Sequence, residues 1–244
     1  MIAVDGLRKR FGTVTAVDDV SFVAGDGAIT GLLGPNGAGK TTTLRMLYAV
    51  MQPDAGRIRV DEVDAVQSPQ AAQMRLGVLP DGFGLYPRLT AREHIHYFGE
   101  LQGITGTRLA ERTAELLQLL DMTAIADRRA SGFSHGERTK VALARSLVHD
   151  PQNILLDEPT NGLDVMSTRA VRGIIRTLRD AGRCVVFSSH VMQEVSALCD
   201  GIIVIAAGRV VTKGSPDDLR AQTGHQSLED AFVALTGVDR REDA

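Results

Sequence analysis

One short segment constrains the fold of this chain more than any other feature: Gly34-Pro35-Asn36-Gly37-Ala38-Gly39-Lys40-Thr41. It matches the phosphate-binding pattern G-x-x-x-x-G-K-S/T at every position. An apolar run over residues 28–33 predicts a buried strand before it, and residues 42–51 predict a helix after it. The glycines allow backbone N–H groups to turn toward a phosphate chain, and the helix adds its positive N-terminal end. The segment therefore predicts a nucleoside triphosphate site where a strand meets a helix.

Two side chains of this segment have predicted contacts with the nucleotide. Lys40 is expected to reach the β- and γ-phosphates, and the hydroxyl group of Thr41 is expected to bind Mg²⁺. A glycine-rich turn that binds no ligand is the alternative interpretation. The strand and the helix predicted on either side favour the phosphate site, because the pattern requires both.

The composition and charge of the chain disfavour several other classes of protein. The chain has 244 residues, a net charge of −3 and no tryptophan, so we expect no nucleic-acid partner. The basic run at residues 8–10 is short and is expected to be a solvated strand end. Cys184 and Cys199 are too few for a disulfide framework and are expected to be free thiols. The longest apolar run, residues 202–207, is far shorter than the roughly 20 residues that span a bilayer. We therefore expect a soluble protein, or one held on a membrane surface by a partner.

Strand-like and helix-like segments alternate along the chain, which predicts a parallel sheet covered by helices. Residues 2–33 read as short strands separated by turns at Gly6, Gly12 and residues 25–27. From residue 83 to about residue 150 the pattern is mostly helical. Parallel sheets bind ligands at the carboxyl ends of their strands, and the phosphate loop follows such an end. The later predicted strands are residues 57–60, 76–79, 153–157, 184–188 and 201–206.

Several predicted helices have start signals. Thr90 with Glu93 fits a capping box, in which each side chain binds the backbone N–H group of the other residue. Ser134 with Glu137 fits a second capping box; the free N–H groups of this helix start could equally bind an anion, and the residues alone leave both readings open. Ser227 precedes a last short helix. Another helix buries an apolar stripe and carries four arginines on its opposite face, which we expect to be solvated: Arg169, Arg172, Arg176 and Arg179.

Two further strand ends carry residues suited to phosphate chemistry. The apolar strand that ends at Asp157 and Glu158 aims Asp157 at the phosphate site, where it can hold Mg²⁺ through water, and Glu158 is then placed to polarise the attacking water. His190 follows the next strand in the same way, and a neutral imidazole there could contact the γ-phosphate or the water. Acids that merely end a strand and a structural histidine are the alternatives. The phosphate loop in the same chain disfavours both.

The order of these motifs resembles the ATP-binding subunit of ABC transporters, over essentially the whole chain. The resemblance rests on the phosphate loop and on residues 134–137, 155–159, 161–164 and 189–190. It implies an α/β fold of the P-loop NTPase type, with a RecA-like core, an antiparallel β subdomain and an inserted helical subdomain. In this single ABC ATPase domain, the resemblance implies a RecA-like and β core from residues 1–82 and 151–220, a helical subdomain from residues 83–150 with the signature motif, and a C-terminal helix and tail from residues 221–244.

The resemblance also implies a role for each matching residue. Phe11 matches the aromatic residue that stacks on adenine, although the family usually has tyrosine there. Asp157 matches the Walker B acid, Glu158 the catalytic base and His190 the switch histidine. Asp164 matches the loop acid that links two nucleotide sites. The Walker A match, which the resemblance implies binds the nucleotide, comprises Gly34, Pro35, Asn36, Gly37, Ala38, Gly39, Lys40, Thr41 and Thr42.

The signature segment Ser134-His135-Gly136-Glu137, which with Phe133 before it matches the family pattern LSGGQ, departs from that pattern at two positions. In the family, this segment binds the γ-phosphate held by a second copy of the chain. His135 replaces a glycine and Glu137 replaces a glutamine. Ser134 and Gly136 remain, so the hydroxyl group and the close backbone approach are expected to survive.

Asp81 is a second departure, because the family has a glutamine there that contacts Mg²⁺ and the attacking water. Aspartate is shorter and only accepts hydrogen bonds when it is ionised. It could coordinate Mg²⁺ more strongly, or it could add repulsion beside the phosphates, so it bears on both the rate and the coupling of hydrolysis. The resemblance thus implies that Lys40, Asp81, Glu158 and His190 carry catalysis and that Thr41, Asp157 and Asp81 bind the metal.

The function that the resemblance implies is ATP hydrolysis with ATP and Mg²⁺, coupled to export. Two copies are expected to sandwich two ATP molecules head to tail and to power a separate integral membrane permease from the cytoplasmic face of the inner membrane. Residues 79–93 and the tail 227–232 are similar to exporter ATPases of the sodium-export (NatA-like) and drug-resistance branch. Residues 83–87 are the expected contact with the permease.

Two other functions compete with export. A soluble ABC ATPase of translation or DNA maintenance is disfavoured, because the chain has one module, no heptads and no basic face. A nucleotide-dependent binding switch gains some support from Asp81 and the altered signature, and a measured ATPase activity would exclude it. A GTPase switch is disfavoured because no Asn-Lys-x-Asp motif occurs.

Overall fold

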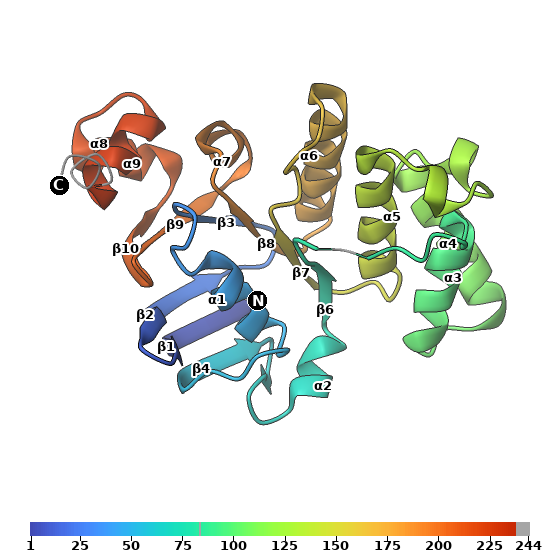
Figure 1. Cartoon of the computed structure of the whole chain (residues 1–244), viewed down its shortest axis with the longest axis horizontal. Helices are drawn as coiled ribbons and strands as arrows, with labels where there is room; N and C mark the ends of the chain where they lie inside the picture. The colour runs from blue at the N-terminus through green and yellow to red at the C-terminus, as the bar shows by residue number, and fades with distance from the viewer. Residues whose placement is uncertain (83, 238–244) are drawn as a thin grey trace.

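The computed structural model describes residues 1–82 and 84–237, and its elements form layers around a six-stranded sheet (Figure 1). Five strands of this sheet are parallel, and only the edge strand β10 runs antiparallel to its neighbour β9. Mostly buried apolar runs form the five parallel strands, as predicted, whereas the edge strand is half-exposed and was not predicted. From one edge to the other they are β10 (Arg209–Gly214), β9 (Gly201–Ala206), β3 (Ile29–Leu33), β8 (Cys184–Ser189), β7 (Asn153–Asp157) and β6 (Leu76–Leu79).

A four-stranded antiparallel sheet forms a second layer below the first in Figure 1. Gly6 lies inside its strand β1 and not at a turn, so the predicted turn at this position is wrong. Gly6 has a φ of 59°, and the register between β1 and β2 shifts between Val4 and Leu7, so the chain bulges and continues as one strand. In order, the strands are β2 (Val14–Ala24), β1 (Ile2–Phe11), β4 (Ala55–Val60) and β5 (Val63–Asp64).

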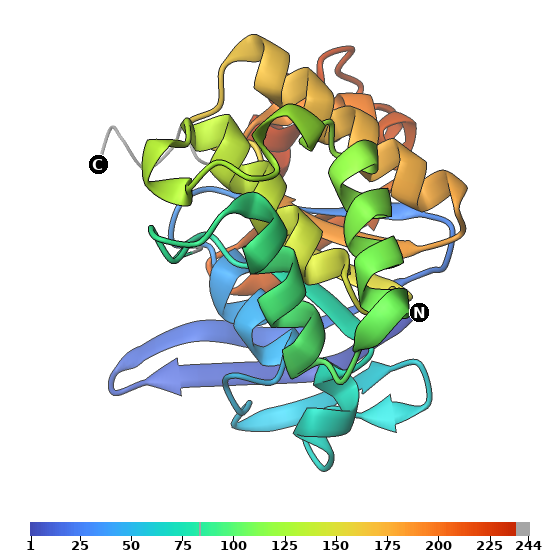
Figure 2. The same ribbon diagram turned by 90° about the vertical axis from the view of Figure 1, so that its right-hand side faces the viewer.

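Helices cover both faces of the six-stranded sheet. Helix α1 (Lys40–Leu47) lies between the two sheets, whereas α6 (Val165–Asp180) and α7 (Met192–Leu198) lie on the opposite face (Figure 1). Three helices gather at the β6 end of this sheet (Figures 1 and 2): α3 (Ala91–Leu101), α4 (Gly106–Leu119) and α5 (His135–Leu147). The remaining helices are α2 (Pro69–Gln73), α8 (Pro216–Thr223), α9 (Leu228–Thr236) and the short 3₁₀ turns Thr123–Ile125 and Ala130–Gly132.

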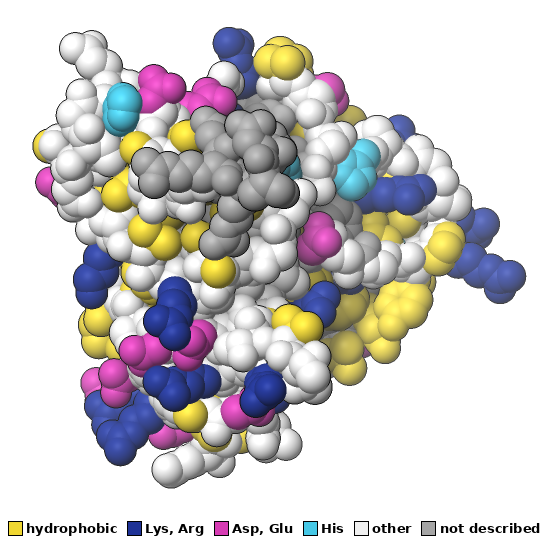
Figure 3. All heavy atoms as spheres, turned by 60° about the vertical axis from the view of Figure 1, so that its left-hand side comes forward, with side chains coloured by type: hydrophobic (Ala, Val, Ile, Leu, Met, Phe, Trp, Pro, Cys, Tyr) yellow, Lys and Arg dark blue, Asp and Glu magenta, His cyan; other side chains and the backbone are white. Residues whose placement is uncertain are grey.

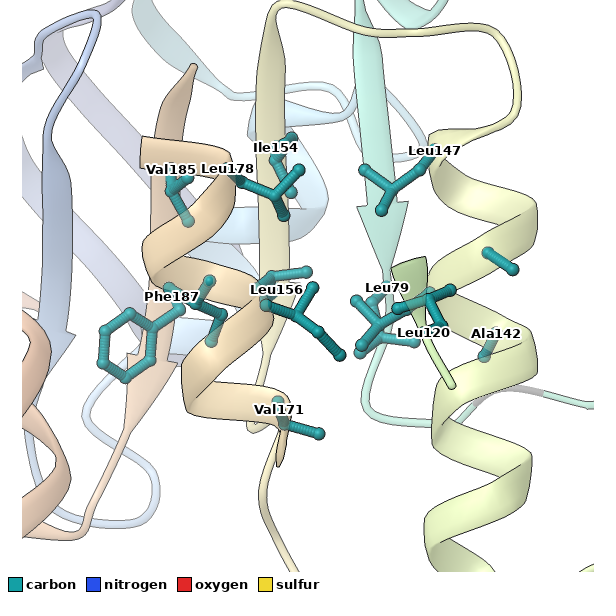
Figure 4. Packing of buried hydrophobic residues seen from close by; sticks show 14 of the residues in the cluster. Leu79, Leu120, Ala142, Leu147, Ile154, Leu156, Val171, Leu178, Val185 and Phe187 are labelled. Carbon is teal, nitrogen blue, oxygen red and sulfur yellow. The ribbon is translucent and has the colours of Figure 1, made fainter. Parts of the chain in front are cut away.

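The six-stranded sheet separates two hydrophobic cores because side chains alternate along each strand. On β7, Ile154 and Leu156 belong to the core on the side of α5 and α6, whereas Leu155 belongs to the core shared with α1 and the second sheet. Figure 4 shows side chains of β7, β8 and the covering helices in the first core. Cys184 and Cys199 are buried free thiols, as predicted, and burial raises the pKa of Cys184 to about 11. The sheet is thus held rigidly from both faces.

The predicted helix starts are confirmed, but the helix after the phosphate loop differs from its predicted bounds. The Thr90 hydroxyl accepts from the Glu93 N–H at 3.1 Å, and the Glu93 carboxylate accepts from the Thr90 N–H at 2.8 Å. Helix α1 spans Lys40–Leu47 and not 42–51. It ends early because Ala49 takes a left-handed φ of 56°, which no helix continues.

The basic run at residues 8–10 is offset by acidic side chains of neighbouring segments. The Lys9 ammonium lies 2.8 Å from Asp54, and the Arg8 guanidinium lies 3.7 Å from Asp18. Figure 3 shows basic and acidic side chains interspersed on this side of the molecule. Within residues 1–82 and 84–237, every helix is too short or too polar to cross a bilayer.

Candidate active site

The phosphate loop borders a cavity of about 440 Å³ at the carboxyl ends of the central strands. Two glycines hold the loop tightly against its neighbours. A Cβ on Gly34 would lie 2.2 Å from the carbonyl oxygen of Ile205, and one on Gly39 would lie 2.4 Å from that of Ala16. Only glycine fits these positions, as the pattern predicts. The cavity is lined by Ala16, Asn36, Gly37, Ala38, Gly39, Lys40, Thr41, Thr42, Asp81, Glu158, Asn161 and His190.

Lys40 begins α1 and lies under the phosphate loop, with only 6% of the residue exposed. Its ammonium group donates to the carbonyl oxygens of Gly34 at 2.7 Å and Pro35 at 3.2 Å. It also lies 3.7 Å from the Glu158 carboxylate. Burial lowers the pKa of Lys40, and the nearby carboxylates oppose this shift. The ammonium group therefore lies between the loop and the acidic strand end, where phosphate oxygens can replace the loop carbonyls.

Asp157 ends β7 below the loop and is 2% exposed. Its Oδ1 accepts from the Ser188 hydroxyl at 2.6 Å and from the Thr41 hydroxyl at 3.3 Å. Burial raises the pKa of Asp157, although the two hydroxyl groups act against the shift. The other oxygen, Oδ2, is buried and has no hydrogen-bond partner among the described residues.

The unpartnered Oδ2 of Asp157 is the type of ligand that Mg²⁺ binds. Mg²⁺ prefers oxygen ligands and usually binds proteins through one or two carboxylates together with phosphates and water. The Thr41 hydroxyl donates to the other oxygen of Asp157, and Thr41 and Asp81 both line the cavity. The described residues contain no group of three or more His, Cys, Asp or Glu side chains that could hold a metal by themselves. The donor set therefore fits an ion that is bound jointly with a nucleotide.

Glu158 and His190 meet at the mouth of the same cavity. The Glu158 backbone has a left-handed φ of 49°, and its N–H group donates to the Ser188 hydroxyl at 3.0 Å. This turn directs the side chain into the cavity, where Oε2 lies 3.0 Å from Nδ1 of His190 and Oε1 faces Lys40. The structure thus brings together the phosphate loop, both strand-end acids and the histidine, as predicted. The sequence reasoning did not single out Ala16 or Asn161 as cavity residues.

Phe11 and the signature segment do not line this cavity. Phe11 ends β1, is 46% exposed, and has the Lys9 ammonium 5.8 Å from its ring centre. Its predicted contact with adenine therefore remains a prediction. The aromatic face is available at the surface.

Ser134–Glu137 forms the N-terminus of α5, and its predicted capping box is confirmed. The Ser134 hydroxyl accepts from the Glu137 N–H at 3.2 Å, and the Glu137 carboxylate accepts from the Ser134 N–H at 2.8 Å. Burial favours a higher pKa for Glu137, but the Ser134 N–H and the nearby Arg128 outweigh it, so the pKa is lowered. The altered side chain His135 lies with Nε2 3.0 Å from the carbonyl oxygen of Asn161. The signature thus contacts the loop that follows the acidic strand of its own chain.

Gly136 and Asp164 lie at the same contact, where the N-terminus of α5 approaches that of α6. A Cβ on Gly136 would lie 2.5 Å from the Ser167 hydroxyl, so α5 approaches α6 as closely as glycine allows. Asp164 caps α6 by accepting from the Ser167 N–H and hydroxyl, each at 2.8 Å, and these bonds lower its pKa. Asp164 is exposed, and Val165 and Met166 beside it are each 71% exposed. The signature and the Asp164 loop therefore form an exposed surface that adjoins the cavity at Asn161 but does not line it.

Comparisons with known proteins identify the family. A family model described as ABC transporter matches residues 17–161, more than half of the chain. The ABC transporter ATP-binding protein NatA of Bacillus subtilis is 42% identical over 239 residues, covering 96% of this chain and 97% of that protein. The daunorubicin resistance ATP-binding protein DrrA3 of Streptomyces coeruleorubidus is 37% identical over 256 residues, covering 98% of this chain and 81% of that protein.

Solved structures show the same fold. The structure of an ATP-binding subunit of an ABC transporter has a TM-score of 0.87 and 27% identity, covering 96% of this chain and 99% of that chain. A dimeric ATP-binding cassette in a post-hydrolysis state, bound to ADP and Pi, has a TM-score of 0.80 and 23% identity, covering 88% of this chain and 98% of that chain. The expected α/β fold of the P-loop NTPase type is therefore confirmed.

The fold and the cavity define a P-loop ATPase. The chain belongs to the ABC transporter family, as an ATP-binding subunit that hydrolyses ATP.

Proposed function

We propose that two copies of this chain close around two ATP molecules and that hydrolysis reopens them to drive a separate membrane permease. One observation carries the proposal: the Glu158 carboxylate lies between the Lys40 ammonium at 3.7 Å and the His190 imidazole at 3.0 Å, inside the cavity of the phosphate loop. A carboxylate, an ammonium group and an imidazole ring thus converge on one place. This is the arrangement that hydrolysis of a terminal phosphate needs.

In this mechanism, Glu158 accepts the proton of the attacking water, and His190 orients the Glu158 carboxylate through its Nδ1. Lys40 exchanges its loop carbonyls for phosphate oxygens and stabilises the charge that develops on them. When bound, Mg²⁺ would be held by Thr41, Asp157 and Asp81 and would neutralise charge on the phosphates. The main-chain N–H groups of the loop bind the remaining phosphate oxygens.

A second copy completes the site in this proposal. The signature segment does not line the cavity of its own chain, and it lies on an exposed surface with the Asp164 loop. A two-fold arrangement would place this surface over the cavity of the partner, so that Ser134 and the α5 N-terminus face its γ-phosphate. The dimeric cassette bound to ADP and Pi, which shares the fold, supports this assembly.

The loop after β6 is the proposed contact with the permease, on the cytoplasmic face of the membrane. Phe83 of this predicted contact lies outside the described residues. Tyr86 is 51% exposed, while its backbone N–H donates to Nε2 of His94 at 2.9 Å and its ring lies edge-on to Tyr97 at 5.7 Å. His94 is itself buried, and burial lowers its pKa, so a neutral ring holds the loop from behind. The loop thus presents an aromatic side chain on a fixed support.

The proposal for the transported substrate rests on similarity to relatives alone. The sodium-export and drug-resistance branch stated above, together with a daunorubicin resistance ATP-binding protein at 37% identity, supports an exporter of sodium ions or of drugs. The permease would supply the substrate contacts. Flux of sodium and of an anthracycline in proteoliposomes that contain both subunits would separate the two substrates.

The test of the proposed function uses tagged Glu158→Gln protein. We expect it to bind ATP, to remain a dimer with ATP and Mg²⁺, and to lose about 10²–10⁴-fold in turnover, the usual contribution of a general base. Glu115→Gln, an exposed glutamate on α4, is the matched control and should hydrolyse ATP normally. Turnover near the wild-type rate in Glu158→Gln would exclude Glu158 as the base.

The same variant tests the partner. Pulled down with ATP and Mg²⁺ from detergent-solubilised native membranes, it should retain a multi-spanning protein in stoichiometric amount. Tyr86→Glu in the same background should release that protein, whereas Val23→Glu, on exposed strand β2, should not. Recovery of a soluble dimer alone would overturn the exporter proposal. Leu85 is unsuitable for this test because it packs partly against the core.

A further inference from the structure

A buried carboxylate lies behind the catalytic cavity, outside the residues that line it. Glu194 belongs to α7 and is 5% exposed. Its Oε2 accepts from the hydroxyl groups of Thr160 at 2.5 Å and Ser189 at 3.2 Å, and its Oε1 lies 3.4 Å from the Arg172 guanidinium. A buried charge is costly unless it is paired and hydrogen-bonded, and these three contacts from three segments offset that cost.

The Thr160 contact fixes the loop that carries the proposed base. Thr160 is two residues after Glu158, and the turn between them is closed by the Asn161 N–H, which donates to the Glu158 carbonyl at 3.1 Å. The Leu163 N–H donates to the Thr160 carbonyl at 3.2 Å, which closes the next turn. A displacement of Thr160 therefore moves the backbone of Glu158.

The Ser189 contact fixes the loop that carries the histidine. Ser189 ends β8 and is fully buried, and its hydroxyl also accepts from the Val191 N–H at 3.0 Å. His190 lies between these two residues, so its backbone is held at both sides. One oxygen atom of Glu194 thus binds both loops, while Glu158 and His190 meet at 3.0 Å on the cavity side.

Arg172 supplies the opposite charge, and its contact with Glu194 shows that one prediction from the sequence is wrong. We expected the arginine face of α6 to be solvated, but Arg172 is directed at Glu194, and the Arg176 guanidinium donates to the Ala197 carbonyl at 3.0 Å. Part of this face therefore fastens α6 to α7. The Arg172 guanidinium thus places a positive charge beside the enclosed carboxylate.

We propose that Glu194 is a positioning residue for ATP hydrolysis: it sets the distance between the Glu158 loop and the His190 loop. This inference rests on the proposed roles of Glu158 and His190. Because Glu194 does not touch the cavity, its loss should leave nucleotide binding intact and should misplace the base relative to its histidine. A misplacement of about 1 Å can lower turnover about 100-fold.

The experiment compares Glu194→Gln, Glu194→Met and Thr160→Val. Gln keeps an oxygen that accepts both hydroxyl groups, so we expect it to retain most of kcat. Met removes the acceptor at similar volume and should lower kcat about 10–100-fold with KM for ATP changed less than twofold. Thr160→Val removes one hydroxyl and should lower kcat even if Glu194→Met fails to fold. The matched control is Thr113→Val, a buried threonine on α4 that bonds only to Leu109 of its own helix.

Three readouts separate positioning from stability: kcat per folded molecule, KM for ATP, and Tm. If the role of Glu194 were purely structural, Glu194→Gln, Glu194→Met and Thr160→Val would lower Tm but leave kcat of the folded fraction unchanged. That result would overturn the inference. Equal losses of kcat in Glu194→Gln and Glu194→Met would also overturn it, because the acceptor would then be irrelevant. Glu158→Gln is measured in parallel. If it is inactive while Glu194→Met and Thr160→Val are fully active, only the inference fails; if it turns over normally, the proposed role of Glu158 fails.

Discussion

Ser188 joins both acids of the active site through one hydroxyl group, so its removal tests how the site is held together. The hydroxyl donates to Asp157 Oδ1 at 2.6 Å and accepts from the Glu158 N–H at 3.0 Å, and Ser188 is fully buried. Ser188→Ala deletes a hydrogen bond to a carboxylate and leaves a backbone donor without its partner. A hydrogen bond to a charged group contributes about 1.5–3 kcal/mol, and an unsatisfied buried donor costs about 1–3 kcal/mol.

Together these two contributions predict a loss in the free energy of unfolding of about 2.5–6 kcal/mol at pH 8. Ser146→Ala is the matched control, since its buried hydroxyl makes only one neutral bond, to the Leu143 carbonyl at 2.8 Å, and should cost about 1 kcal/mol. Urea unfolding of both variants without nucleotide gives the two numbers directly. A cost for Ser188→Ala no larger than that for Ser146→Ala would refute the reasoning.

The pH dependence gives a second check on the same variant. Burial raises the pKa of Asp157 in the folded chain above its usual value, so the folded state binds a proton more readily than the unfolded state. Ionised Asp157 thus costs stability at high pH, and that cost declines as the pH falls from the folded pKa toward the lower pKa of the unfolded state. The Ser188 hydroxyl supports the ionised form, so Ser188→Ala should raise this pKa further. Its cost should be larger at pH 8 than at a pH below the raised pKa of Asp157, and a cost independent of pH would contradict the assignment.

Three other predictions test the nucleotide contacts. Phe11→Ala should weaken ATP binding about tenfold while Phe11→Tyr does not, because stacking on a base contributes about 1–3 kcal/mol; isothermal titration would measure both Kd values. Gly136→Ala should lower kcat about 100-fold without weakening ATP binding, because its Cβ would lie 2.5 Å from the Ser167 hydroxyl. Gly132→Ala, whose Cβ would meet no atom within 4 Å, is its control, and equal kcat values in steady-state assays would refute the prediction. Chelation of Mg²⁺ with EDTA should stop phosphate release while ATP still raises Tm through Lys40 and the loop.

The sequence predicted those elements of the fold whose local residue pattern matches their burial in the structure. Strands β7 and β9 have their predicted bounds because both are short apolar runs that are buried on two faces. Strand β10 was missed, because its residues Arg209–Gly214 mix polar and apolar side chains without a buried apolar run, and it pairs antiparallel with β9 at the sheet edge. Helix α7 has seven residues, too few for a period of 3.6 to be read.

The same distinction applies to the site. The residues that follow parallel strands, such as Asp157 and His190, were predictable because strand order alone brings them to one sheet edge. Most of the contacts that orient them were not, because they join segments far apart in the sequence, as Ser188 does with Asp157. A serine in an apolar strand or a glutamate on a short helix has no local signal for such a bond. Yet Ser188 binds Asp157 and the backbone of Glu158, and Glu194 binds Thr160 and Ser189, so the geometry of the site depends on residues that the motifs do not include.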